Sequence, residues 1–129
     1  MEPQKELMLM LKTLIEEKLD LPISLEELSA DGEVYAELGA GYTEKKYRNG
    51  PALIVCPVMF LTIGADEPAC IDRLGKITNY LKRTPARAMP KGSTYSWRGC
   101  TVAAEPNKIG RREDGQVLYS CIVNCKICF

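Results

Sequence analysis

Apolar residues recur at helical spacing in two segments of the chain, residues 3–19 and 66–83. Pro3 suits a first helical turn, Asp66 is a suitable N-cap residue, and Pro85 ends the second segment. Each pattern therefore predicts an amphipathic helix. The predicted core positions are Leu7, Leu11, Leu14 and Ile15 in the first helix and Cys70, Leu74, Ile77 and Leu81 in the second.

Five other segments have the composition and shorter period of strands. They are residues 33–38, 42–47, 52–63, 94–104 and 116–129. Asn49-Gly50 predicts a tight hairpin turn between the segments 42–47 and 52–63. Residues 24–28 are expected to add one helical turn, and residues 106–115 a loop. The order α-β-β-β-α-β-β predicts one α+β domain over residues 1–129, an antiparallel sheet of about four or five strands with two helices packed on it.

The segment 52–63 is apolar on both faces of the predicted strand. Leu53, Val55 and Met59 alternate with residues such as Ile54 and Val58. Two arrangements explain this pattern. In one, the two predicted helices cover opposite faces of the sheet. In the other, a second subunit covers part of the surface.

Charge and composition exclude several classes of function. Seventeen basic residues balance seventeen acidic ones, and there is no histidine. The lack of a basic excess argues against sequence-specific nucleic-acid binding and against attachment to an anionic membrane. Without histidine, Ser-His-Asp and Cys-His catalysis are excluded. No signal peptide or membrane span is evident, so we expect a cytosolic protein. No set of residues in the sequence forms a credible catalytic arrangement, so we expect neither an enzyme nor a need for a cofactor.

The C-terminal segment contains the motif Cys121-x-x-x-Cys125-x-x-Cys128. Its spacing resembles the cluster-binding motif of radical S-adenosylmethionine enzymes. On a strand, however, Cys121 and Cys125 share one face and Cys128 points to the other, so the three sulfurs diverge. We therefore expect reduced, core-forming thiols and no metal. A small metal- or iron–sulfur-binding protein that uses these three cysteines is the alternative.

The residues expected to form an interface lie in the two predicted hairpins. Aromatic and arginine side chains in exposed turns are typical interface anchors. The candidates are Tyr42, Tyr47, Arg48, Arg111 and Arg112.

Several short segments resemble one known family. They are residues 39–41, 74–81, 93–95 and 104–106, together with the turn 113–115 and Tyr119 that follows it. On these segments, and over nearly its whole length, the chain resembles the bacteriophage minor capsid proteins that share the fold of siphophage tail terminators.

The resemblance implies a structural role in virion assembly. Such proteins form rings, commonly hexamers, that end the tail tube and contact the tail-tube and head-completion proteins. No catalytic residue is implied. The expected location is the virion of a phage or prophage and, during assembly, the host cytoplasm. A dimeric α+β module that binds a ligand is a third possibility.

Overall fold

The computed structural model describes residues 1–28 and 32–129 and forms one α+β domain with a mixed six-stranded sheet. The helices are α1 (Pro3–Leu19), α2 (Glu67–Arg83) and the 3-10 helix η1 (Ala86–Ala88). The strands are β1 (Ile23–Ser24), β2 (Val34–Leu38), β3 (Tyr42–Lys46), β4 (Ala52–Gly64), β5 (Ser96–Arg111) and β6 (Val117–Cys128). The predicted α+β class and both long helices are therefore confirmed. The sheet itself differs from the prediction: it has six strands rather than four or five, and the short strand β1 pairs in parallel.

The strand order across the sheet is β1-β2-β4-β6-β5, and β3 pairs with the first part of β4. All pairs are antiparallel except β1 with β2. The predicted helical turn at residues 24–28 is wrong: Ile23 and Ser24 form β1, and residues 25–28 are not helical. Ile23 donates its N–H to Glu16 Oε2 at 3.1 Å, and its carbonyl accepts from Lys12 Nζ at 2.7 Å. These contacts with α1 hold the segment extended beside β2.

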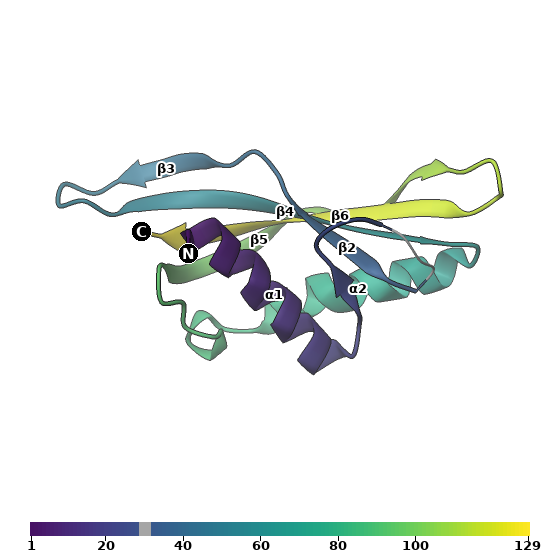
Figure 1. The fold of residues 1–129 in the computed structure, drawn as a ribbon, viewed down its shortest axis with the longest axis horizontal. Helices are drawn as coiled ribbons and strands as arrows, with labels where there is room; N and C mark the ends of the chain where they lie inside the picture. Colours follow the sequence, from purple (N-terminus) through teal and green to yellow (C-terminus); the bar gives the residue numbers. More distant parts are fainter. Residues whose placement is uncertain (29–31) are drawn as a thin grey trace.

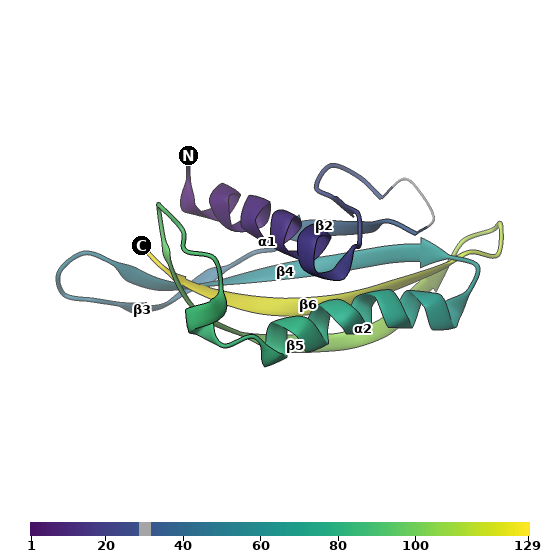
Figure 2. The ribbon, with the colours of Figure 1, turned by 90° about the horizontal axis from the view of Figure 1, so that it is seen from below.

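Both helices pack on the same face of the sheet (Figures 1 and 2). α1 lies over β2 and β4, whereas α2 lies over β6 and β5. A single core joins the two helices to the sheet: Leu11 and Leu74 belong to the same buried cluster as Phe60 and Val123. The arrangement with one helix on each face is therefore wrong. Helical periodicity shows which residues of a helix are buried, but not which side of the sheet the helix covers.

The predicted strand 94–104 is longer than expected, and the predicted loop at 106–115 is correspondingly wrong. β5 continues through Pro106 to Arg111, with several register shifts along its pairing with β6. β5 is the last strand of the sheet, and a proline on an edge strand need not break the ladder. The remaining turn is short: Arg112 N–H donates to the Gln116 carbonyl at 2.7 Å.

β4 changes its partner near Pro57. Its residues 52–55 pair with β3, and residues 58–62 pair with β2. Proline has no N–H to donate, so it suits the point between two partners. Here the chain from β2 to β3 passes close to β4, and Gly39 donates its N–H to the Pro57 carbonyl at 2.7 Å. A Cβ at Gly41 would lie 2.5 Å from the Val55 carbonyl oxygen, so the crossing requires glycine there.

A carboxylate on α1 fixes the segment between α2 and β5. Ser93 and Thr94 each donate a backbone N–H and a hydroxyl to Glu6, at distances of 2.6 to 3.0 Å. These bonds, first those from the Thr94 and Ser93 side chains, lower the pKa of Glu6 to about 2. These bonds therefore hold the segment before β5 against the first turn of α1.

Candidate assembly surfaces

The face of the sheet opposite the helices, here called the open face, carries a band of apolar side chains. Met59 lies opposite Ile122, and Ile63 lies opposite Leu118, across the β4–β6 ladder. Val55 and Ile63 are buried, but the rest of the band is partly exposed. These partly exposed residues are Leu53, Pro57, Met59, Leu61, Leu118 and Ile122. The open face thus keeps apolar surface in contact with solvent, and neither long helix of the described chain covers it.

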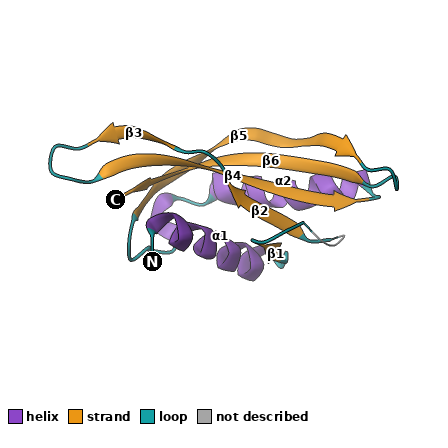
Figure 3. Cartoon of the chain, turned by 45° about the horizontal axis from the view of Figure 1, so that its top comes forward, coloured by secondary structure: helices purple, strands orange, loops and turns teal. Residues whose placement is uncertain are grey.

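The β3–β4 hairpin forms a projecting arm at one end of the sheet (Figures 1 and 3). We call residues 42–51 the arm. Every one of them is exposed, including Tyr42 at 57% and Tyr47 at 40%. The Lys45 ammonium lies 5.1 Å from the centre of the Tyr47 ring, and Glu44 pairs with Lys126 at 3.1 Å. Three of the interface candidates, Tyr42, Tyr47 and Arg48, come together on this arm.

The other two candidates lie on the β5–β6 hairpin, at the far end of the sheet from the arm (Figure 1). Arg111 is held by its own domain: it donates to the Gly115 carbonyl at 3.1 Å and lies 3.5 Å from Glu67. Glu67 also pairs with Lys108 at 3.0 Å and accepts from the Tyr119 hydroxyl at 2.9 Å. These contacts, with Lys108 and Tyr119 first, lower the pKa of Glu67.

Arg111 therefore links β5 to the first turn of α2 through its ion pair with Glu67. Arg112 is exposed beside it in the turn. The sequence does not show the Glu67 contacts, because Glu67 lies 44 residues before Arg111.

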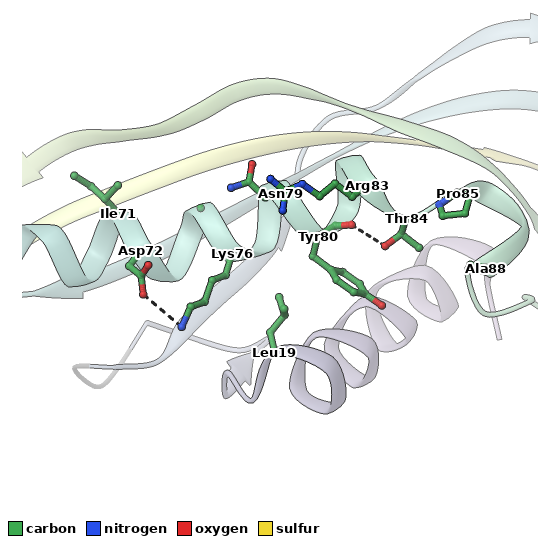
Figure 4. A pocket seen from close by; sticks show the side chains of 11 residues that line it. Leu19, Ile71, Asp72, Lys76, Asn79, Tyr80, Arg83, Thr84, Pro85 and Ala88 are labelled. Atoms are coloured by element: carbon green, nitrogen blue, oxygen red, sulfur yellow. Dashed lines mark hydrogen bonds and ion pairs between the residues drawn. The ribbon is translucent and has the colours of Figure 1, made fainter.

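A groove lies along α2, beside the end of α1 (Figure 4). Its volume is about 810 Å³, and Leu19 and Tyr80 supply apolar surface from the two helices. Ile71 is 46% exposed at one end. Asp72 and Lys76, the acid and base nearest to each other in this groove, form an ion pair at 3.4 Å. The groove thus offers a partly apolar contact surface, and sequence analysis did not identify it.

The C-terminal cysteines divide between the two faces of the sheet. Cys121 and Cys125 face the helices, with Cys125 opposite Cys56 on β4 and Cys100 on β5. Cys128 lies opposite Leu53 on the open face. Burial raises the pKa of Cys121 to about 12 and that of Cys125 well above its ordinary value.

Metal ligation needs thiolates, so this environment disfavours it. Over residues 1–28 and 32–129, no group of three or more His, Cys, Asp or Glu side chains is placed to hold a metal ion. Neither α1 nor α2, the long helices of the described chain, has the length and apolarity to cross a bilayer.

Comparison with known proteins shows a similarity of structure. No protein-family model matches the sequence. No curated protein matches it. A solved chain from the virion of a native gene transfer agent particle has a similar structure, with a TM-score of 0.55 at 8% sequence identity. The match covers 92% of this chain and 84% of that one. At this identity the likeness is one of fold.

Proposed function

We propose that this protein is a structural component of a phage-like particle, which works by binding copies of itself and other virion proteins. The open face carries the proposal. On this face Met59, Leu61, Leu118 and Ile122 keep partly exposed apolar surface, although Ser120 and Asn124 lie among them. Apolar surface gathered on one uncovered face of a soluble domain marks an association surface. The similar fold in a gene transfer agent virion supports this context.

The finer role we propose is that of a tail terminator or a head–tail joining minor capsid protein. In this role the chain forms a ring, with six copies as the expected number, that ends the tail tube. The arm and the β5–β6 hairpin lie at opposite ends of an elongated sheet (Figure 1). Different surfaces at two ends favour head-to-tail contacts, and such contacts give closed rings when the rotation between copies closes.

The partners in this proposal are neighbouring copies, the tail-tube protein and a head-completion protein. The protein reaches the virion from the host cytoplasm, where the particle is assembled. No reaction is part of the role, because the ring acts through its shape and surface. The lack of histidine in the sequence supports a non-enzymatic protein.

The direct test is native mass spectrometry over a concentration series, with negative-stain electron microscopy of the same samples. We expect a discrete oligomer larger than a dimer and ring-shaped particles. A monomer at every concentration contradicts the proposal. A stable dimer with no larger species contradicts it too, and favours a dimeric ligand-binding module instead.

A further inference from the structure

The arm has the chemistry of a ligand for an acidic surface. It contains three basic residues, Lys45, Lys46 and Arg48, and one acidic residue, Glu44. Glu44 already pairs with Lys126 of its own domain. The arm therefore presents a net positive charge together with two exposed tyrosine rings. Aromatic and arginine side chains contribute much of the binding energy at protein interfaces.

A second groove on the molecule has complementary properties. It has a volume of about 360 Å³ and lies between the start of α1 and β2. Leu25, from the segment that joins β1 to β2, also lines it. Its apolar surface comes from Met8, Leu25, Tyr35, Ala36 and Leu38.

The exposed carboxylate of Glu37 lines the groove. Two more exposed acidic residues, Glu26 and Glu27, directly follow the lining residue Leu25 in the sequence. Ser24 Oγ accepts the backbone N–H groups of Glu26 and Glu27, each at 3.4 Å, which orders the backbone that carries them. Lys5 is the one basic residue in the lining.

The edge of β2 beside this groove is open to pairing. β1 pairs only with Val34 and Tyr35 of β2. Within the described chain, residues 36–38 of β2 therefore have no strand partner on that side. β4 occupies the other edge of β2. An unpaired strand edge beside an apolar groove is a site at which an extended segment of another chain can add to the sheet.

From these observations we infer that the arm of one copy docks in the α1–β2 groove of the next copy. Lys46 and Arg48 then face Glu26, Glu27 and Glu37, and the arm tyrosines cover the apolar lining. The arm and the groove are different surfaces, so the contact is heterologous and propagates around a ring. This inference rests on the proposed function, since it names a second contact between the copies, in addition to the open face.

Disulfide trapping between two singly substituted chains tests the contact. In a Cys100→Ser background, Asn49→Cys on the arm tip and Glu26→Cys beside the groove are purified separately, mixed and mildly oxidised. We expect a disulfide-linked heterodimer that neither variant forms alone in comparable yield. As a matched control, Asn49→Cys is mixed with Asp114→Cys, at the tip of the other hairpin. Equal cross-linking in the control mixture overturns the inference.

Charge reversal supplies a second, independent measurement. Lys46→Glu/Arg48→Glu on the arm, or Glu26→Lys/Glu27→Lys at the groove, should each weaken self-association by roughly tenfold. A chain that carries all four substitutions should regain most of the lost association. Arg87→Glu, at an exposed position on η1, is the control and should leave association unchanged.

The outcomes separate the inference from the function on which it rests. If the wild-type protein assembles and both charge-reversed variants assemble equally well, the arm–groove contact is wrong but the assembly role stands. If the wild-type protein stays monomeric throughout, both are wrong.

Discussion

The two faces of this sheet are built from the same strands but differ in burial: the helices cover one face, and the other stays partly exposed. On β4, Val58 and Phe60 point to the helices and are fully buried, whereas Met59 and Leu61 point the other way and stay partly exposed. On β6, Val123 and Ile122 differ in the same manner. Neighbouring apolar residues therefore do different work: one set stabilises the monomer, and the other remains available for association.

The sequence of β4 has the apolar pattern of a strand that is buried on both faces, although the helices cover only one of them. Apolar residues on both sides of a strand are usual where helices cover both faces. Here both helices lie on one face, so the apolar pattern of the other face requires another cause. Association with a second chain is the cause that we propose.

Truncation on the helix face should produce the largest loss of stability. Phe60 is the largest fully buried side chain of the core and belongs to the same buried cluster as residues of both helices. Phe60→Ala should lower the free energy of unfolding by about 3–5 kcal/mol, because it removes apolar contacts and leaves a cavity. Urea denaturation followed by circular dichroism measures the change. A loss below about 1 kcal/mol would contradict the assignment of this face as the core.

A smaller loss is expected where the chain crosses from β2 to the arm. Gly41→Ala places a methyl group 2.5 Å from the Val55 carbonyl, so the backbone must shift. We expect a cost of about 1–3 kcal/mol in unfolding free energy, measured in the same way. Gly39→Ala is the matched control, since its Cβ would lie 3.4 Å from the Pro57 carbonyl oxygen. Equal effects of the two substitutions would show that the close approach does not govern this crossing.

Glu6 should link the stability of the helix face to pH. Its pKa is about 2 in the folded protein, below the ordinary value of 4.5. The stabilisation by its ionised form is therefore complete above about pH 4.5 and is lost as the pH falls through about 2. Glu6→Gln should lower the melting temperature at pH 7, and the difference from wild type should shrink between pH 4.5 and 2. A constant difference over that range would mean that the Glu6 charge has no part in the stabilisation.

Local patterns predicted the parts of the fold that depend on local chemistry. Both long helices begin and end close to the expected residues because helical period and proline position are encoded nearby. The sequence could not show that β5 continues past Pro106, because only the edge position of that strand makes the proline tolerable. Nor could it place both helices on one face, which is a property of the assembled layers.

The same distinction applies to the candidate site. Asn49-Gly50 identified the hairpin, and with it Tyr42, Tyr47 and Arg48 as exposed residues. Arg111 lies in an equally suggestive hairpin but is held by Glu67. The α1–β2 groove joins residues from separate parts of the chain, so it became visible only in three dimensions.

The most direct test of the account is native mass spectrometry of Met59→Glu beside the wild-type protein, with circular dichroism to check folding. A charge at this partly exposed position should alter the unfolding free energy of the monomer by less than about 1 kcal/mol. Leu9→Glu, at an apolar position of α1 that is 37% exposed, is the matched control and should associate as the wild type does.

The account predicts a wild-type oligomer larger than a dimer and a folded, monomeric Met59→Glu. An oligomer of unchanged mass and affinity in Met59→Glu would contradict the claim that the open face of the sheet mediates assembly.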